Sequence, residues 1–310
     1  MHRIATLDEL PALPALAVII NCGTKWVTSL ALASTQAHAG LPVLLVDCES
    51  ADDSSEHFAR LARRLPAPFY WIDRPLRRHG VTLDALLGEL TSARVLLVDS
   101  DVEIRTSAVV SAMRDALDAR PYAYGAGFLH PGQWMGPQHG VAPCVGFHAE
   151  RMWIPLVMLR TDAIGEALRS GASFAQRREY RRGPRNAALA RWWGLRHRLR
   201  AFMPARQSRG AGSAGSTRCD GVEPAFVEHD TGAEMHRALL AGGHEFAALD
   251  VDLWGDVAHF HGVSRMTLRN RALRAAQHLA LLRPVTAGAE PDLIATVKRR
   301  LEEGYGIAIA

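Results

Sequence analysis

The N-terminal half of the chain alternates short apolar runs with stretches in which apolar residues recur at helical spacing. Short continuous apolar runs are typical of strands covered on both faces, and strands that alternate with helices indicate a parallel α/β sheet. The pattern predicts, in chain order, a strand over 15–22, a helix over 28–39, a strand over 43–46, a helix over 54–65, a strand over 69–72, a helix over 83–90, a strand over 95–98 and a helix over 107–119. Short crossovers between such strands give a mostly parallel, doubly wound sheet with helices on both faces and a ligand crevice above the carboxyl ends of its strands.

The second half of the chain is less regular and contains a long basic insertion. Residues 121–146 are rich in Gly and Pro and are predicted to form a loop over the substrate rather than a packed element. Residues 173–217 are predicted to be the insertion, and its last part, SRGAGSAGST, has the composition of a flexible linker. The other expected elements are a strand over 154–159, a helix over 162–170, an ordered stretch over 223–226, a helix over 234–243, a strand-like stretch that reaches His259 and an Arg-rich helix over 266–282.

The composition is that of a globular protein, because an apolar fraction of 48% over 310 residues supports a large core. No apolar run approaches the roughly 18–20 residues that span a bilayer, and the N-terminal run LPALPALAVIINC is interrupted by prolines and lacks a basic leader. We therefore expect a cytoplasmic protein. Its four cysteines have no C-x-x-C spacing, so they are expected to be reduced and to form neither a disulfide framework nor a zinc site.

The net charge of +4 is unevenly distributed along the chain. Residues 176–210 contain eleven arginines and a single acidic residue, Glu179, so the rest of the chain is net acidic. A local basic segment favours one specific anionic partner over general nucleic-acid binding. Trp192 and Trp193 beside arginines are typical of a helix at an anionic membrane surface, although a solvated basic loop explains the same residues. A non-enzymatic adaptor for a membrane or a nucleic acid is therefore one interpretation, but it leaves the acidic residues described next unexplained.

Two carboxylates, Asp99 and Asp101, follow the strand over 95–98 in the sequence RVLLVDSDVEI. They are expected at the carboxyl end of a buried strand, where open α/β sheets bind ligands. Carboxylates two residues apart repel each other unless a cation lies between them or water solvates both, and hard oxygen ligands suit Mg²⁺ or Mn²⁺. The pair predicts a site for a metal-bound diphosphate, and a solvated strand end is the alternative.

Four motifs occur in an order that resembles the GT-A glycosyltransferases, in particular glycosyltransferase family 2. The motifs are VDCESADDSSEHF after the second strand, VDSDVE after the strand over 95–98, EHD before a helix, and HFHGVS at the end of the ordered core. The resemblance is good over residues 15–120 and looser over 150–170 and 222–265. It implies a GT-A (Rossmann-like) domain over 1–265, made of a nucleotide-binding half over 15–120 and an acceptor half over 121–265, followed by a helical extension over 266–310.

The resemblance implies a nucleotide-binding role for several residues of the first half. In the family, the first aspartate of a V-D-x-x-S-x-D-x-S pattern contacts the nucleotide, and Asp47 matches it, with Asp52 as a second contact. The segment before the strand over 95–98 resembles a glycine-containing helix that packs over the donor, so Arg77 and His79 are expected near the diphosphate or ribose. A turn or helix-cap role for Asp47 and a solvated position for Arg77 are the structural alternatives.

The metal ligands are also assigned by the resemblance. The D-x-D motif of the family corresponds to Asp99-Ser100-Asp101, which implies metal ligation by the two aspartates and a donor contact for Ser100. The family often has a third ligand, a histidine five residues before a serine, and His259 stands in that position before Ser264. His261 is an equal candidate, because residues two apart on a strand face the same side and either imidazole can bind a divalent cation.

The catalytic base is the remaining assignment. The family has a Glu-Asp pair at the start of a helix that faces the acceptor, and the EHD triplet of this chain implies Asp230 as the base, with a helix-cap role as its alternative. The implied reaction is transfer of a sugar from a nucleotide-diphosphate donor to a hydroxyl of a saccharide or lipid-linked acceptor, with Mn²⁺ or Mg²⁺ as cofactor and with inversion. Attachment to the inner face of a membrane through the basic segment fits a lipid-linked acceptor.

The main rival is a deviant P-loop ATPase of the partitioning type. The sequence CGTKWVTSLALASTQAHAGLPVLLVDCES resembles the first strand, Lys-Thr turn, helix and second strand of those enzymes. A phosphate-binding loop needs several glycines so that successive backbone N–H groups turn toward the phosphates. Only Gly23 precedes Lys25 closely, so this interpretation is the weaker one.

Overall fold

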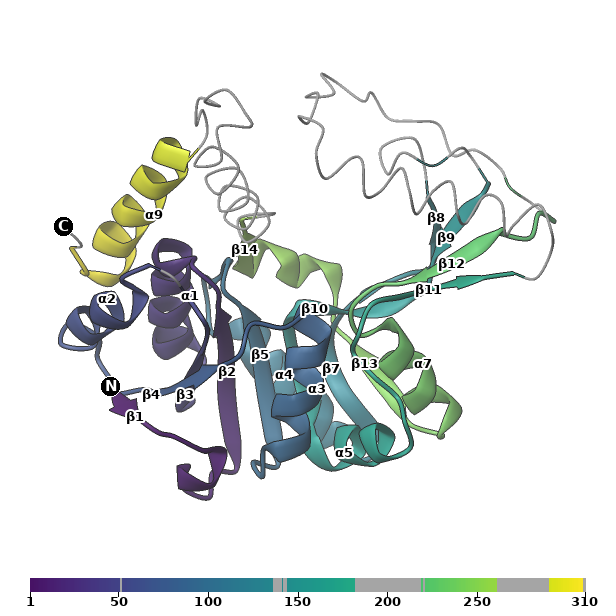
Figure 1. Cartoon of the computed structure of the whole chain (residues 1–310), viewed down its shortest axis with the longest axis horizontal. Coiled ribbons are helices and arrows are strands. Elements are labelled where there is room, and N and C mark those ends of the chain that lie inside the picture. The colour runs from purple at the N-terminus through teal and green to yellow at the C-terminus, as the bar shows by residue number, and fades with distance from the viewer. Residues whose placement is uncertain are drawn as a thin grey trace.

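A central eight-stranded sheet organises the chain (Figure 1). The computed structural model describes residues 1–50, 52–135, 141, 144–181, 219, 221–260 and 290–308. The strands are β1 His2–Arg3, β2 Ala15–Asn21, β3 Val43–Cys48, β4 Tyr70–Arg74, β5 Arg94–Asp99, β6 Val102–Ile104, β7 Ala123–His130, β8 Gln133–Trp134, β9 Gly146–His148, β10 Arg151–Arg160, β11 Arg177–Tyr180, β12 Phe226–His229, β13 Glu245–Ala248 and β14 Val257–His259. The helices are α1 Lys25–His38, α2 Ser54–Leu61, α3 His79–Glu89, α4 Ala108–Ala119, α5 Thr161–Arg169, α7 Ala233–Ala241 and α9 Glu290–Tyr305, with 3-10 helices η1 Leu7–Glu9 and η3 Val251–Asp256.

The strand order of the central sheet is β1-β4-β3-β2-β5-β10-β7-β13. Neighbouring strands are parallel, except that β10 runs antiparallel to both β5 and β7. The predicted mostly parallel, doubly wound α/β fold is therefore confirmed. Because β10 runs in the opposite direction, its first residues lie at the same edge of the sheet as the carboxyl ends of β2, β3 and β5.

Helices cover both faces of this sheet. Side chains of α1, α2, α4 and α9 form one apolar core with it, and side chains of α3, α5 and α7 form the other. Strand β2 shows how the sequence leads to this arrangement: Leu16 and Val18 belong to one core, and Ala17 and Ile19 belong to the other. Successive side chains of a strand point to opposite faces, so a strand covered on both sides has a continuous apolar run instead of an alternating one.

The predicted elements of the first half all occur, although α1 and α3 begin earlier than predicted, at Lys25 and His79. Helix α9 lies within the predicted C-terminal helical extension, and its side chains Val297 and Leu301 are fully buried in the core that includes α1. The helix predicted over 266–282 lies outside the described residues. The proposed boundary between a domain and an extension at residue 265 stays a prediction.

The prediction of a loop over 121–146 is wrong for its first part, because β7 is a buried strand between β10 and β13. Residues 136–140 and 142–143 of this range lie outside the described residues. Its glycines are required by packing. A Cβ added to Gly125 would lie 2.8 Å from Leu159 Cδ2, and a Cβ added to Gly127 would lie 3.2 Å from a backbone oxygen of β10. The glycines of AYGAGFLH therefore make room for neighbouring strands and side chains, which is a known role of glycine inside sheets.

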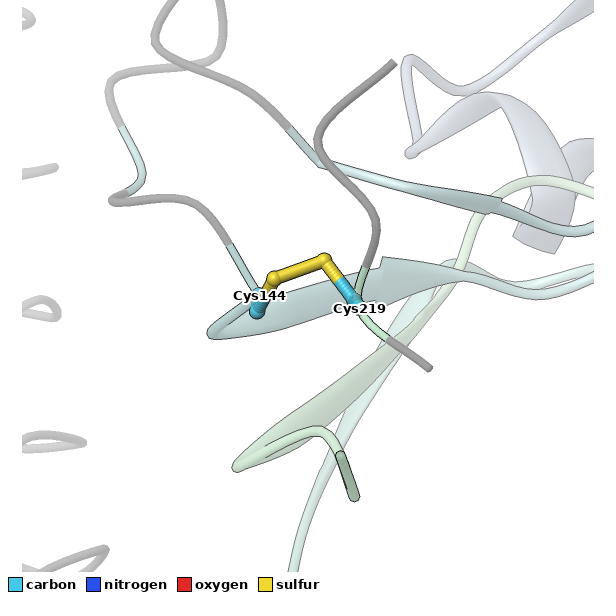
Figure 2. The surroundings of a disulfide bond; sticks show 2 residues. All are labelled: Cys144 and Cys219. Carbon is cyan, nitrogen blue, oxygen red and sulfur yellow. A yellow bond between two sulfur atoms is a disulfide. The ribbon is translucent and has the colours of Figure 1, made fainter. Parts of the chain in front are cut away.

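A second sheet, in the order β11-β12-β9-β8, projects from the main body (Figure 1). Cys144, just before β9, forms a disulfide with Cys219, 75 residues later (Figure 2). The expectation that all four cysteines are reduced is therefore wrong for this pair, whereas Cys22 and Cys48 are free. The two bonded cysteines meet because β12 pairs in parallel with β9, and the spacing of the cysteines in the sequence does not indicate this pairing.

Burial raises the pKa of the Cys48 thiol to about 12, so this side chain stays protonated and unreactive in the folded protein.

The described part of the basic segment is neutralised within the protein. In β11, Arg177 Nε lies 2.9 Å from Glu234 Oε2, and Arg178 Nε lies 2.5 Å from Glu228 Oε2. The tryptophans and the Gly/Ser linker of the segment lie outside the described residues. None of the helices in the described part of the chain combines the length and the hydropathy that a bilayer-spanning helix needs.

From the burial of His57 we predict that the protein loses stability at acidic pH. Its ring in α2 is 4% exposed, its Nε2 lies 2.7 Å from Ser29 Oγ, and burial, with help from Lys25, lowers its pKa to about 4. Below the ordinary histidine pKa of about 6.5, the unfolded chain binds a proton that the folded chain does not, so the free energy of unfolding falls between pH 6.5 and 4. We expect this group to remove about 2 kcal/mol between pH 7.5 and pH 5.

Urea unfolding at these two pH values measures the effect. The His57→Gln variant keeps an acceptor for Ser29 but does not titrate, so the difference between its two unfolding free energies should be about 2 kcal/mol smaller than that of the wild type. An equal difference in both proteins would show that His57 is not held neutral by the fold.

Candidate metal and donor site

Three side chains that can bind a metal meet at the carboxyl edge of the central sheet. Strand β5 ends at Asp99, a turn follows, and β6 begins directly after Asp101. Strand β14 pairs antiparallel with β6, and this pairing places His259 opposite Val102. Single ligand atoms of Asp99, Asp101 and His259 all lie within 4.8 Å of one another, and His259 Nε2 is 3.2 Å from Asp101 Oδ1. His261, the alternative third ligand, lies outside the described residues.

The electrostatics of this cluster favour a bound cation. Burial raises the pKa of the Asp99 carboxyl, His79 opposes this shift, and Asp101 adds to it. The side chain of Asp101 is only 9% exposed, so the alternative of a freely solvated strand end does not hold. Carboxylate oxygens suit Mg²⁺ and Mn²⁺, and a neutral imidazole completes such a set of ligands. The residues present thus fit a divalent cation.

The N-terminus of α3 lies beside the same cluster. His79, the first residue of α3, has its Nε2 3.6 Å from Asp99 Oδ1. The first amides of a helix carry a partial positive charge and commonly bind phosphate groups. Of the other predicted donor residues, Ser100 is buried in the turn between the two aspartates, and Arg77 is exposed two residues before α3. The structure therefore brings His79 and Ser100 to the metal cluster, whereas none of the contacts in the described part of the chain locates Arg77 there, and its donor role stays a prediction.

The predicted nucleotide contacts, Asp47 and Asp52, lie on the neighbouring part of the same edge. Asn21 Nδ2 donates a hydrogen bond to Asp47 Oδ1 at 2.6 Å, and Ser50 donates to Asp47 from both its backbone N and its Oγ. Asp52 accepts hydrogen bonds from the N and Oγ of Ser54 at the start of α2. Asp47 therefore also serves the turn function that the sequence offered as its alternative, and Asp52 contacts the start of α2. Two strand spacings, roughly 10 Å, separate β3 from β5, a distance that a nucleotide diphosphate can bridge.

The residues that suggested a P-loop ATPase have other partners. Lys25 Nζ pairs with Asp53 Oδ1, and the backbone N of Gly23 donates a hydrogen bond to Ser50 Oγ at 2.7 Å. A phosphate-binding loop instead directs its lysine and several backbone N–H groups at the phosphates. The geometry of this turn gives that interpretation no support.

Asp230 lies at the junction between β12 and α7. Its Oδ2 is 3.3 Å from Nη2 of Arg151, the first residue of β10. Leu156 in the same strand pairs with Val98, the residue before the end of β5, so Arg151 lies beyond the end of β5, and an irregularity between Met152 and Val157 interrupts the strand in between. Asp230 Oδ1 also accepts a hydrogen bond from the backbone of Thr231, which agrees with a helix-start role.

The other two residues of the EHD triplet are structural. Glu228 and His229 belong to β12 and are 5% and 4% exposed. Glu228 accepts hydrogen bonds from Gln176 and Arg178, and His229 Nε2 lies 3.3 Å from Glu179 Oε2. Of the two carboxylates of the triplet, that of Asp230 is the accessible one, with its side chain 32% exposed.

A hydrogen-bonded chain beside Asp230 was missed by the sequence analysis. Tyr124 Oη contacts His236 Nδ1, and His236 Nε2 lies 3.2 Å from Glu150 Oε1. Burial lowers the pKa of His236, so the neutral ring accepts from the tyrosine at Nδ1 and donates to Glu150 at Nε2. Glu150 precedes Arg151, the partner of Asp230. The partners are 112 and 86 residues apart in the sequence, so no local pattern could have found this chain.

Known proteins offer only distant similarities. No protein-family model and no curated protein sequence matches the chain. Among solved structures, the chain is similar to the mannosyltransferase PcManGT from Pyrobaculum calidifontis, solved with GDP-Man and Mn²⁺, at 14% identity and a TM-score of 0.44, over 96% of this chain and 74% of that chain. It is also similar to TarS from S. aureus, at 15% identity and a TM-score of 0.36, over 53% of this chain and 50% of that chain.

A third similar structure is glucosyl-3-phosphoglycerate synthase from Mycobacterium tuberculosis, solved with Mn²⁺, UDP and phosphoglyceric acid. The identity is 13% and the TM-score 0.34, over 52% of this chain and 61% of that chain. Because these three TM-scores are below 0.5, the similarities by themselves assign neither a substrate nor a reaction. The functional conclusion therefore rests on the residues of this chain and their geometry.

Proposed function

We propose that this protein is a metal-dependent GT-A glycosyltransferase that transfers a sugar from a nucleotide-diphosphate donor to an acceptor hydroxyl. One observation carries the proposal: Asp99, Asp101 and His259 meet at the carboxyl edge of a doubly wound sheet, where such sheets bind their ligands. The order of the motifs along the chain, which resembles glycosyltransferase family 2, supports the same assignment.

The donor would lie across the edge of β3, β2 and β5. Asp99, Asp101 and His259 would hold Mn²⁺ or Mg²⁺, which when bound neutralises the negative charge that develops on the departing diphosphate. His79 and the amides at the start of α3 would bind diphosphate oxygens from the other side. Asp47 and Asp52 would contact the nucleotide, Arg77 would lie near the diphosphate or the ribose, and Ser100 would contact the donor between the two aspartates.

Asp230 is the proposed catalytic base. A carboxylate that takes the proton of the acceptor hydroxyl as its oxygen attacks must be ionised and fixed in orientation. Arg151 contacts Asp230 at 3.3 Å and supplies both the positive charge and the orientation. Attack in a single displacement, on the side opposite the diphosphate, would invert the anomeric configuration.

The acceptor and the location of the enzyme are further parts of the proposal. A saccharide or a lipid-linked saccharide would enter from the side of Asp230, and the arginines of 176–210 would bring the enzyme to an anionic membrane surface. A cytoplasmic location was expected from the sequence. The disulfide between Cys144 and Cys219 counts against a cytoplasmic location, because such bonds are rare in the cytosol of mesophiles unless they are transient or redox-sensing.

A thermal-shift panel tests the proposed reaction class. UDP-, GDP- and dTDP-sugars are each added with Mn²⁺, with Mg²⁺ and with EDTA. One donor at about 100 times its Kd should stabilise the protein by about 2.7 kcal/mol, or roughly 4 °C in Tm, and only when a divalent cation is present. The absence of any metal-dependent shift across the panel would contradict the proposal.

A further inference from the structure

A buried carboxylate next to the metal cluster has no role in the proposed reaction. Glu103, in β6, is 6% exposed and lies two residues beyond Asp101. Its Oε2 contacts Arg300 Nη1 and lies 3.9 Å from Arg105 Nε, and its Oε1 accepts a hydrogen bond from Tyr305 Oη at 3.3 Å. A carboxylate removed from water in this way needs such partners, because an unpaired buried charge is strongly destabilising.

Two of these partners come from the C-terminal helix α9, almost 200 positions further along the chain. The contact between Glu103 and Arg300 spans 197 residues of sequence. Val297 and Leu301 of the same helix are fully buried against the core, and Lys298 Nζ lies 4.6 Å from the centre of the Trp26 ring in α1. Helix α9 is therefore docked beside α1 by apolar contacts (Figure 1). Its side chains Arg300 and Tyr305 reach Glu103 of β6.

The same arginine also touches the other strand of the metal cluster. Arg300 Cζ lies 5.4 Å from the centre of the Phe260 ring, directly after β14. The backbone N of Phe260 donates a hydrogen bond to the backbone O of Asp101 at 2.8 Å. Arg300 thus contacts β6 through Glu103 and the end of β14 through Phe260. Asp101 directly precedes β6, and His259 is the last residue of β14.

This arrangement matters because β6 and β14 form only a two-stranded sheet of three residues per strand. Such a pair is marginally stable when it stands alone. Metal ligands, in contrast, must be held to within about 0.5 Å, and the residues that contact them commonly change metal affinity by 10–100-fold when they are replaced. Something outside the two strands has to fix them.

We propose that Arg300 and Tyr305 are positioning residues, which act through Glu103 and Phe260 to hold Asp101 and His259 in their metal-binding geometry. Helix α9 is then part of the metal site and not an appendage of the fold. The inference rests on the proposed function only in taking the cluster as a metal site, since the contacts themselves are independent of any reaction.

Mn²⁺ binding, followed by the EPR signal of free Mn²⁺, tests the inference on the full chain without any substrate. Arg300→Met should weaken Mn²⁺ binding by 10–100-fold, Tyr305→Phe by a few-fold, and Arg300→Lys should recover part of the loss. Arg299→Met is the matched control: Arg299 is the adjacent residue of α9, 63% exposed and paired only along the helix with Glu303, and its replacement should leave the affinity unchanged.

A second readout keeps the inference independent of the proposed reaction. The imidazole signals of His259, assigned by NMR with the help of His259→Gln, should shift in metal-free Arg300→Met and should not shift in Arg299→Met. If folded Arg300→Met keeps both the wild-type Mn²⁺ affinity and the wild-type His259 signals, the inference is wrong even if donor binding is confirmed. If the wild type binds no Mn²⁺, the proposed function fails, and the NMR comparison still decides whether α9 positions His259.

Discussion

Replacing Asp101 with asparagine should reduce sugar transfer by on the order of 10²–10³-fold in kcat, the loss typical of removing one electrostatic stabiliser of a developing charge. The substitution keeps the size and the hydrogen-bonding capacity of the side chain but removes its negative charge. Asp101 is 9% exposed and lies 3.2 Å from His259, so water cannot take the place of the lost carboxylate. Release of the nucleoside diphosphate, from the donor that the thermal-shift panel selects, measures the rate.

The matched control is Asp118→Asn. Asp118 is also an aspartate paired with a basic residue, Arg94, but it is 61% exposed in α4. Its replacement should leave the rate and the donor-induced Tm shift unchanged. In the metal-free state, Asp101→Asn should be at least as stable as the wild type, because one of two adjacent carboxylates that repel each other is gone. Metal-dependent transfer at the wild-type rate in Asp101→Asn would show that this aspartate is not a ligand.

The sequence predicted those parts of the fold that are encoded locally. The strands before Asp47 and Asp99 are continuous apolar runs because helices cover them on both faces, and this pattern requires no knowledge of their neighbours. Strand β7 was mistaken for a loop because its sequence, AYGAGFLH, contains two glycines. What makes glycine necessary at position 125 is the side chain of Leu159 in the adjacent strand, and the sequence around the glycine does not contain this information.

The same distinction separates the predicted and the missed parts of the candidate site. Asp99 and Asp101 are two residues apart at the end of a recognisable strand, so their chemistry could be inferred from spacing. His259 depended on the resemblance to a family, and the pairing of β14 with β6 places its Nε2 3.2 Å from Asp101 Oδ1. Residues that act across long separations left no local signal, and Glu103 with Arg300 is an example. The Cys144–Cys219 disulfide was missed for the same physical reason.

Replacing Gly80 with alanine should destabilise the protein by about 3 kcal/mol, the upper end of the usual range for overpacking a close contact. A Cβ at this position of α3 would lie 2.3 Å from the backbone oxygen of Phe174. That oxygen accepts a hydrogen bond from Gly232 N at 3.1 Å, and the backbone N of Phe174 donates to Asp84 Oδ1 at 2.7 Å. The Phe174 backbone therefore cannot move away from a Cβ at position 80 without the loss of at least one of these hydrogen bonds.

The Gly80→Ala substitution should also lower the activity, because Gly80 follows His79 and Gly232 lies two residues after Asp230. A shift of the Phe174 segment would move the start of α3 on the donor side and the Asp230 turn on the acceptor side together. Gly88→Ala provides the matched control in the same helix: its Cβ would meet only Leu168 Cδ1, at 3.8 Å, and alanine should stabilise the helix by about 0.5 kcal/mol or more. Urea unfolding of both variants should thus give changes of opposite sign for the same substitution, and equal stabilities would show that α3 does not pack against Phe174 as closely as described.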